Sequence, residues 1–560
     1  GSVLAIVGSG AGGGTLANAL AKQKIRSVVL EAGKRHTLED IENDEWAMFK
    51  KISWLDKRIA AGDWHLAENN PNLPAWIVKA VGGTTTHWSG ATPRFKPHEF
   101  RTRSTYGRVD GASLMDWPLS YEELEPYYTR AEDAIGSTHR GGRPPLPANN
   151  NYKVLAAGAE KLGYRHYATG PYGTNAEPYD GRPATVQDGF NFQGDKHGSK
   201  WSIMVSEIPK SLRTGLLDLR PESQAVQITH NPEGRVDGVL YSDAEGNLYR
   251  QKARIVAVAG NAIETPRLLF LSASPLFPDG LANSSGQLGR NYMRHTTGSV
   301  YAQFDEPVHM YRGETMAGLI ADESRHDVDR GFAGGYYMET ISLGPAFLAS
   351  FADPGAWGPD FTALLDGYRN TAGLWVVGED MPQESNAVTL DPTVTDQHGL
   401  PVAHVHFDDH PTDLAMREHA YSRPRRPLVV FTPKQLLRLK AAANSVEDFT
   451  EGRFQPVIPD AGVDPKKVTR VQLVSGRLYY DLLARRNKDG DETTAIVRVE
   501  QLYPLPLDEL RAALEAYPQA EVVWVQDEPA NQGPWPFMAL NLLPQLDREV
   551  RLVSRPASAS

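Results

Sequence analysis

A short apolar run that leads straight into a glycine-rich turn constrains the fold of this chain more than any other feature. Residues 3–7 have the length and the branched side chains of a strand that is buried on both faces. Residues 8–13 then read Gly-Ser-Gly-Ala-Gly-Gly, and a helix-competent run follows at 16–21. A second apolar run at 27–30 ends in Glu31. The order strand, glycine turn, helix, strand and acid predicts a βαβ unit of a parallel sheet.

This unit has the features of a dinucleotide-binding turn. Gly8 permits a tight turn, Gly10 lets the backbone approach a pyrophosphate, and Gly13 lets the helix lie close to the sheet. The amino terminus of the helix would face the phosphate charge, and Glu31 is placed to accept hydrogen bonds from ribose hydroxyls. A glycine turn alone could be a plain connection between a strand and a helix, but here the full context favours a dinucleotide. The spacing does not separate FAD from NAD.

Length and composition exclude several classes of protein. The 560 residues suffice for about three or four compact units, and the formal charge of −11 argues against nucleic acid as a partner. Because there is no cysteine, disulfides, thiolate-held metals and cysteine nucleophiles are absent. No apolar stretch reaches about 18 residues and no leader-like segment opens the chain, so we expect no membrane span and a cytoplasmic protein.

The composition changes near residue 421. All 16 histidines lie at or before His419, and 45 of the 50 glycines lie within 1–421. Residues 1–421 carry 39 basic and 51 acidic side chains, whereas residues 422–560 carry 19 and 18. Two different kinds of protein are therefore joined here. The join at 422–427 holds two prolines and three arginines, which is typical of a linker; contact of the arginines with phosphate is the alternative.

A second segment of the first part also suits a cofactor. Residues 82–95 combine glycines, hydroxyl side chains, His87 and Trp88 in one short loop. Such a loop can wrap a flat polar ring, because glycine permits close approach and hydroxyls and amides donate hydrogen bonds. An ordinary polar turn around a buried tryptophan is the alternative interpretation from the residues alone.

With these motifs, residues 1–421 resemble the glucose–methanol–choline (GMC) oxidoreductase family. The Thr-Thr-His-Trp element at 85–88 is similar to the pyranose-oxidase-like branch, which includes bacterial sugar and glycoside oxidases, and segments 192–202, 256–269 and 288–295 also fit. The resemblance implies an FAD-dependent oxidoreductase that oxidises a hydroxyl of a sugar or glycoside by hydride transfer to flavin, with oxygen or a quinone as acceptor. It implies a Rossmann-like FAD-binding domain at 1–100 and 211–300 and an α+β substrate-binding domain at 101–210 and 301–421.

The resemblance also implies which residues bind FAD. They are Gly8, Gly10, Ala11, Gly12 and Gly13 at the pyrophosphate, Glu31 at the ribose, Val226 near the adenine, Gly82, Gly83, Thr86, His87, Trp88 and Ser89 along the isoalloxazine, and Ala259 in the second signature. The matching histidine of pyranose oxidases can carry a covalent bond to the flavin. For His87 a covalent link and a hydrogen bond both remain open.

Two further expectations concern catalysis and metal. The family's catalytic histidine lies after the substrate domain, but no histidine follows His419, so no catalytic residue is assigned. A strand at 404–410 would place His404, His406 and Asp408 on one face, as in a metal clip. Because flavin enzymes of this type need no metal, we expect a plain strand of the substrate domain.

Residues 422–556 resemble a different protein, the carboxy-terminal domain of the decarboxylating component of 2-oxoglutarate dehydrogenase. The matching segments are 427–434, 448–454 and 526–535. Strand candidates at 471–474, 495–499 and 522–525 alternate with helix candidates at 478–486 and 507–516, which predicts a separate α/β domain, transketolase-C-terminal-like, at 422–560. The alternative for the whole chain is therefore a fusion or chimera. Its flavin half would only bind cofactor, and its carboxy-terminal half would be an effector-binding or assembly module of a 2-oxoacid dehydrogenase complex.

Overall fold

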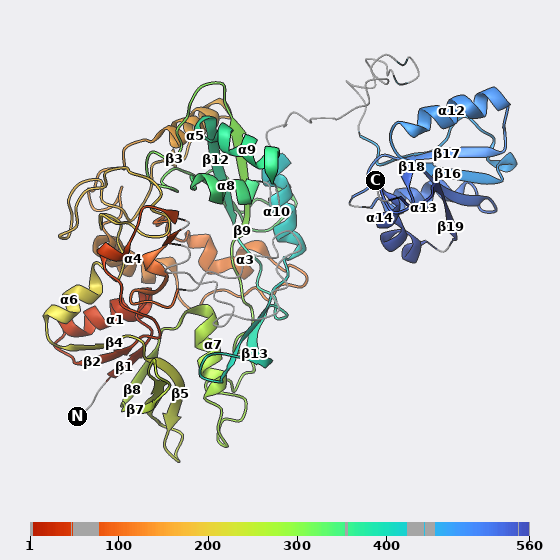
Figure 1. Ribbon diagram of the computed structural model, residues 1–560. Coiled ribbons are helices and arrows are strands. Elements are labelled where there is room, and N and C mark those ends of the chain that lie inside the picture. Colours follow the sequence, from red (N-terminus) through yellow and green to blue (C-terminus); the bar gives the residue numbers. More distant parts are fainter. Residues whose placement is uncertain are drawn as a thin grey trace. The chain divides into compact units, whose positions relative to one another are not determined.

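The chain folds into two compact units, Gly1–Arg426 and Pro427–Ser560, which both mix helices and sheets (Figure 1). The computed structural model describes residues 4–45, 47–48, 78–352, 357–422, 439, 442, 454–503, 505–546 and 548–558. The arginines at the predicted join and the matching segments 427–434 and 448–453 lie outside these residues. Among the helices that are described, none is both long and apolar enough to cross a membrane.

A four-stranded parallel sheet begins the amino-terminal unit. Its strands, in spatial order, are β4 (Leu217–Arg220), β2 (Ser27–Leu30), β1 (Leu4–Val7) and β8 (Ile255–Val258). The predicted βαβ order is confirmed, because α1 (Ala11–Lys22) connects β1 to β2 and these strands pair in parallel, with Ala5 opposite Val28. Every residue of β2 is buried, as in a strand that is covered on both faces.

Different elements cover the two faces of this sheet. They are α6 (Glu207–Arg213) on one face and, on the other, α7 (Asn261–Leu271) with the antiparallel strands β5 (Gln224–His230), β6 (Val236–Ser242) and β7 (Leu248–Lys252). Side chains of β1 alternate between these faces. Ile6 packs against Ile208 of α6, whereas Ala5 and Val7 pack in the cluster that contains Leu268 of α7. The glycine turn after β1 is thereby held on a rigid scaffold.

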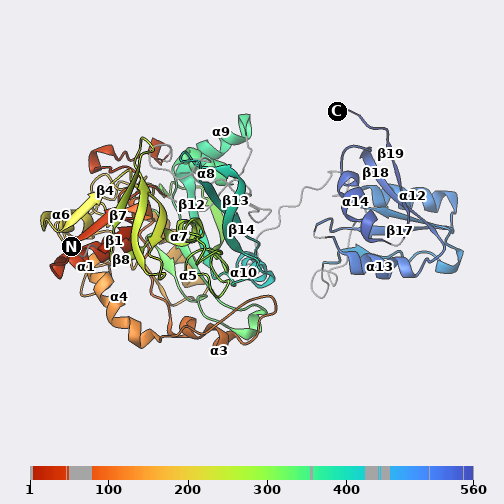
Figure 2. The same cartoon turned by 90° about the horizontal axis from the view of Figure 1, so that it is seen from below.

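A five-stranded antiparallel sheet forms the other part of this unit, away from the parallel sheet in both views (Figures 1 and 2). Its strands, in spatial order, are β3 (Tyr167–Ala168), β10 (Leu319–Ile320), β11 (Tyr336–Thr340), β12 (Thr371–Gly378) and β9 (Thr296–Gln303). Helices around it are α5 (Asn150–Lys161), α8 (Pro345–Ala352), α9 (Gly358–Asp366) and α10 (Pro411–Ser422). The buried amide of Asn151 ties α5 to the sheet, since it donates to the carbonyls of Ile341 and Gly373 and accepts from the Gly373 N–H.

The predicted strand at 404–410 is too long. The hairpin is β13 (Ala387–Thr395) with β14 (Pro401–His406), so Asp408 lies beyond the strand. The reason is that the side chain of Asn386 accepts a hydrogen bond from the Asp408 N–H and so replaces the next bond of the ladder. His404 Nδ1 lies 3.5 Å from Asp391 Oδ2. His404 therefore pairs with Asp391 and does not form a cluster with His406 and Asp408. Within the described residues, no group of three or more histidine, aspartate or glutamate side chains could hold a metal ion.

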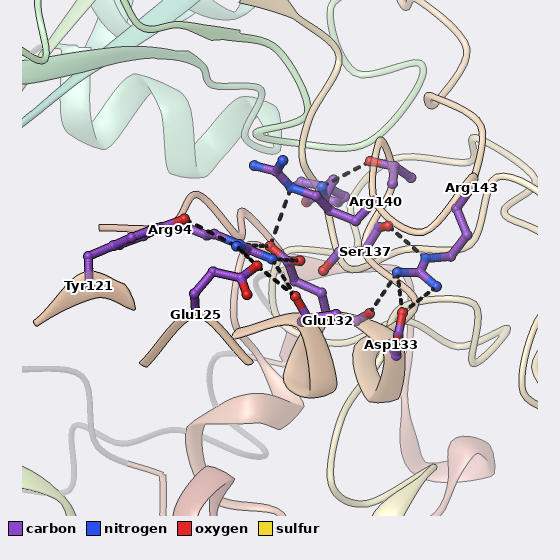
Figure 3. A network of polar contacts seen from close by, with 11 residues as sticks. Arg94, Tyr121, Glu125, Glu132, Asp133, Ser137, Arg140 and Arg143 are labelled. Atoms are coloured by element: carbon purple, nitrogen blue, oxygen red, sulfur yellow. Dashed lines mark hydrogen bonds and ion pairs between the residues drawn. The ribbon is translucent and has the colours of Figure 1, made fainter. Parts of the chain in front are cut away.

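Helix α4 (Tyr121–Ile135) is anchored by a network of charged side chains (Figure 3). Arg94 donates from Nε and Nη2 to the two carboxylate oxygens of Glu132, at 2.7 and 2.6 Å, and from Nη1 to Glu125 at 2.9 Å. The helix begins at a capping box of Ser120 and Glu123. The bidentate pair joins α4 to the end of the loop 82–95, so the second predicted cofactor segment is fixed at its far end.

The carboxy-terminal unit is a separate sheet with helices. Its strands, in spatial order, are β15 (Val457–Ile458), β17 (Thr494–Val499), β16 (Arg470–Val474), β18 (Glu521–Pro529) and β19 (Val550–Arg555), with helices α12 (Leu478–Asp489), α13 (Leu507–Glu515) and α14 (Trp535–Asn541). Strands β16 to β19 pair in parallel, and β15 is antiparallel to β17. Trp524 is fully buried in the core, and its Nε1 donates to Gln526. The predicted strands and helices are confirmed, whereas β15, α14 and β19 were not predicted.

Candidate functional site

A cavity of about 640 Å³ lies where β1, β2 and β8 end and where α1 and α7 begin. Its volume falls in the range of about 300–1,000 Å³ that small-molecule sites occupy. Parallel strands point their carboxyl ends to one edge, so this position is where such sheets bind ligands. Of the residues predicted to bind the cofactor, those that line the cavity are Gly8, Gly10, Ala11, Gly12, Glu31, Gly83 and Ala259.

The glycine turn has two residues whose backbone positions require glycine. Gly8 has φ +91°, and a Cβ there would lie 2.5 Å from the Ala259 carbonyl oxygen. At Gly13 a Cβ would come under 3.0 Å from the Gly8 carbonyl oxygen, since the helix passes directly over the turn. Both residues therefore shape the turn, although Gly13 itself does not line the cavity.

Gly10 and Gly12 lie on the side of the turn that faces the cavity. A Cβ at Gly10 would meet nothing nearer than the Gly83 Cα at 3.7 Å, and one at Gly12 nothing nearer than the Ala259 Cβ at 3.8 Å. Both residues line the cavity at the amino terminus of α1. Free backbone N–H groups and the helix dipole make this end suitable for a phosphate group.

Glu31 stands at the end of β2 and is 5% exposed. Its Oε2 accepts from the N–H and the hydroxyl of Ser9, at 2.9 and 2.7 Å, and its Oε1 accepts from the Gly33 N–H at 2.9 Å. Burial raises the pKa of Glu31, while the hydrogen bonds from Ser9 and Gly33 oppose that change. A carboxylate has about four acceptor positions, so one remains for a ligand hydroxyl in the cavity.

Charged residues that were not predicted line the far side of the cavity. Lys79 precedes the Gly82–Gly83 turn, and Glu264 and Arg267 lie in α7. Arg267 is 2% exposed and donates to Glu264 Oε2 at 3.0 Å and to Asp396 at 2.6 Å. Glu264 and Arg267 lie in the segment 256–269 that resembles the GMC family, so the sequence did carry a signal for them. Nothing in the sequence singled out Lys79.

Only the first turn of the loop that begins at Gly82 lines the cavity. Gly83 and Thr84 line it, and they belong to a short 3₁₀ helix, Gly83–Thr86. Gly82, at φ +103°, donates its N–H to the Ser9 hydroxyl at 3.1 Å, so the loop is joined to Glu31 through Ser9. The residues of this loop that were predicted to bind cofactor but do not line the cavity are Gly82, Thr86, His87, Trp88 and Ser89.

Within this loop, His87 is buried and Trp88 is partly buried. His87 is 3% exposed. Burial lowers the pKa of His87 to about 4, and the charge of Lys200 acts in the same direction, so the imidazole is neutral near pH 7. Trp88 donates from Nε1 to the Trp201 carbonyl at 2.7 Å, and the buried Lys200 ammonium donates to the Trp88 carbonyl at 2.7 Å.

Val226 does not line the cavity. It is buried in β5, and the residues before it, Gln224 and Ala225, form the wall instead. Side chains alternate along a strand, so the direction of a single residue in β5 depends on the register of the sheet. The prediction named Val226, whereas the structure places its neighbours Gln224 and Ala225 at the cavity wall.

Comparison with known proteins identifies the family. A family profile described as GMC oxidoreductase matches residues 72–297. Over 444 residues the chain is 31% identical to 2-methyl-1,2-propanediol dehydrogenase of Mycolicibacterium austroafricanum, in an alignment that covers 75% of this chain and 79% of the relative. The chain belongs to the GMC oxidoreductase family. The GMC profile includes the loop that begins at Gly82 and the cavity residues Lys79, Glu264 and Arg267, and the glycine turn precedes it.

The carboxy-terminal unit matches another family. A profile described as 2-oxoglutarate dehydrogenase C-terminal matches residues 443–560. The chain is 50% identical over 170 residues to the 2-oxoglutarate dehydrogenase E1/E2 component of Corynebacterium glutamicum, and 46% identical over 154 residues to the multifunctional 2-oxoglutarate metabolism enzyme of Mycobacterium sp. (strain JLS). It spans only 13% and 12% of the lengths of these relatives. A GMC oxidoreductase sequence is thus followed by the terminal domain of a different enzyme.

Proposed function

We propose that the amino-terminal unit is an FAD-dependent oxidoreductase that oxidises a hydroxyl of a sugar or glycoside, with oxygen or a quinone as electron acceptor. The observation that carries this proposal is the cavity between the glycine turn and Glu31 in a chain of the GMC family. One relative, 2-methyl-1,2-propanediol dehydrogenase, acts on a diol by its name, and from it we infer alcohol oxidation as the class of reaction. The preference for a sugar rests on the Thr-Thr-His-Trp element at 85–88.

The residues around the cavity fit the adenosine diphosphate half of FAD. Gly10 and Gly12 leave open space where a Cβ would stand, which lets a pyrophosphate approach the backbone. Glu31 keeps an acceptor position for a ribose hydroxyl. In this proposal the Rossmann-like FAD-binding domain comprises 1–100 and 211–300, and the substrate-binding domain comprises 101–210 and 301–421.

Bound FAD supplies the hydride acceptor of the reaction. The residues of the chain would bind and orient it: the turn at Gly10–Gly12 would take the phosphates, and the segment Gly82–Ser89 would hold the isoalloxazine. His87 is neutral near pH 7 because it is buried beside Lys200, and a neutral imidazole can form either a covalent bond to the flavin or a hydrogen bond. We propose the covalent link for His87 and assign no catalytic base.

The visible spectrum of the purified full chain tests this function. We expect a flavin band at about 450 nm that bleaches when glucose, a methyl glycoside or a 1,2-diol is added without oxygen. The compound that bleaches the flavin band fastest indicates the substrate class. Absence of a flavin band would contradict the cofactor, and a band that none of the three compounds changes would contradict the oxidoreductase. A Gly10→Ala chain is the matched control, because its cavity is obstructed while its fold is retained.

The second candidate function concerns residues 422–560. The observation that favours it is a separate unit, with a core of its own around Trp524, that matches the terminal domain of 2-oxoglutarate dehydrogenase. We propose a transketolase-C-terminal-like domain that serves as an assembly or effector-binding module. Co-sedimentation of the full chain with the purified 2-oxoglutarate dehydrogenase complex of Corynebacterium glutamicum tests assembly. Failure to co-sediment at micromolar concentrations would contradict that role.

A further inference from the structure

Three large apolar side chains are exposed close to α4. Met115, Phe95 and Trp117 are 77%, 50% and 49% exposed. The rings of Phe95 and Trp117 lie against the buried Phe100, with ring centres 6.3 and 5.9 Å from that of Phe100. We call Phe95, Met115 and Trp117 the apolar patch.

Hydrogen bonds fix the chain beneath the patch. Trp117 donates its N–H to the Phe100 carbonyl at 3.0 Å, and the Thr102 hydroxyl donates to the Met115 carbonyl at 3.0 Å. The segment 115–117 therefore runs beside the segment 100–102, and both are held in place. The exposed side chains stand on an ordered backbone rather than on a loose loop.

Exposed side chains that adjoin in this way mark a surface that another molecule covers. A single exposed apolar residue is ordinary, but a contiguous group is typical of an interaction site. Phenylalanine, tryptophan, methionine and arginine are enriched at protein–protein interfaces. The carboxylate of Asp116, between Met115 and Trp117 in the chain, already accepts from the N–H and the hydroxyl of Ser104. Covering the patch does not leave this charge unpaired.

Charges of both signs adjoin the patch. The basic margin is Arg101 and Arg103, which are exposed at the start of α3 (Thr102–Tyr106). The acidic margin is Glu122 and Glu123, which are exposed in the first turn of α4. Figure 2 shows α3 and α4 on the same outer side of the amino-terminal unit.

The two margins and the patch form one continuous surface. Phe100 directly precedes the basic margin in the chain, and Tyr121 directly precedes the acidic margin. The ring centres of Phe100 and Tyr121 lie 6.1 Å apart. Because the margins come from different helices, a partner meets the positive and the negative charges at different places.

A surface with this composition fits a second copy of itself. In a dimer with two-fold symmetry both chains use the same surface, so each part of it meets its counterpart across the axis. The basic margin of each chain can then lie against the acidic margin of the other, while the two apolar patches meet. A partner that carries charge of one sign would oppose one of the margins with like charge, which is unfavourable.

We propose that two copies of this chain associate through the apolar patch about a two-fold axis, with the basic margin of each chain against the acidic margin of the other. None of the residues of the patch or its margins lines the cofactor cavity. The inference therefore stands independently of the proposed function.

Sedimentation velocity of the full chain at micromolar concentrations tests the dimer. We expect a species of twice the 61.6 kDa mass of one chain. Met115→Asp should raise the Kd of the dimer by more than about 100-fold, since the dimer would bury two unpaired carboxylates. Leu248→Asp is the matched control, because Leu248 is 62% exposed in β7 and lies outside the patch, and it should leave the Kd unchanged.

Reversal of charge tests the symmetry of the interface. Arg103→Glu and Glu122→Arg should each raise the Kd by about 10-fold, because the two-fold axis places the like charges together twice. A mixture of these two chains should form a heterodimer as tightly as the unmodified chain, since each contact again joins opposite charges.

Three results would overturn the proposal. The first is an unmodified chain that stays monomeric at micromolar concentrations. The second is a dimer that Met115→Asp does not weaken, which would place the interface on another surface. The third is a mixture of Arg103→Glu and Glu122→Arg chains that associates no better than either chain alone. Thermal unfolding of each variant, with a midpoint close to that of the unmodified chain, shows that the fold is retained.

Discussion

Two glycines of the same turn should respond to alanine in opposite ways. At Gly10 the backbone is extended, with φ −70°, and a Cβ would meet only the Gly83 Cα at 3.7 Å. Gly10→Ala should therefore fold, and its free energy of unfolding should rise by up to about 1 kcal/mol, because alanine restricts the conformations of the unfolded chain. The new methyl group would nevertheless occupy the side of the turn that faces the cavity. There it would separate the backbone N–H groups from a pyrophosphate.

The loss in affinity can be estimated from those N–H groups. One hydrogen bond to a charged oxygen contributes about 1.5–3 kcal/mol, so FAD should bind about 10- to 150-fold more weakly to Gly10→Ala. Gly13→Ala should behave differently. Its Cβ would come under 3.0 Å from the Gly8 carbonyl oxygen, where backbone rather than a flexible side chain must move. Overpacking of this kind destabilises by about 1–3 kcal/mol.

Flavin absorbance after gel filtration and thermal unfolding followed by circular dichroism separate the two effects. We expect Gly10→Ala to lose flavin and keep its unfolding midpoint, and Gly13→Ala to unfold at a lower temperature. Undiminished flavin affinity in Gly10→Ala would refute the argument that the pyrophosphate approaches this residue. An unchanged midpoint in Gly13→Ala would refute the argument that the helix needs glycine where it passes over the turn.

Four other results concern ionisable side chains. Burial raises the pKa of Glu339 to about 7 from 4.5, so the folded chain keeps a proton that the unfolded chain releases, and stability should fall as the pH rises from about 4.5 to 7. Glu339→Gln should raise the free energy of unfolding, measured in urea, by about 3 kcal/mol at pH 8 and leave it unchanged at pH 4. An equal gain at both pH values would contradict this. Arg94→Met removes the bidentate partner of Glu132, which is 7% exposed, and should destabilise by about 2 kcal/mol. Glu125→Gln, at the more exposed end of the same network, should cost under about 1 kcal/mol. For a covalent link at His87, acid precipitation should leave flavin with the protein and His87→Ala should release it; flavin found wholly in the supernatant of the unmodified chain would exclude the link.

The local parts of the fold could be predicted because their causes lie close together in the sequence. The βαβ start follows from apolar strands and from a turn that needs glycine at Gly8. The strands and helices of the carboxy-terminal unit follow from alternation of apolar runs. Errors arose where a distant residue intervened. The strand at 404–410 stops at His406 because the side chain of Asn386, just before the partner strand β13, accepts the hydrogen bond from the Asp408 N–H.

The sequence by itself determined the glycine turn at Gly8–Gly13 between a strand and a helix, and a boundary between two kinds of protein, since both depend on neighbouring residues and on composition. Only the tertiary structure decided which side chains meet across the cavity. Lys79 and Glu264 are far apart in the chain and come together because α7 packs on the sheet beside the segment before Gly82. Such a pairing has no local signature, because it depends on the register and packing of elements that the chain connects through long loops.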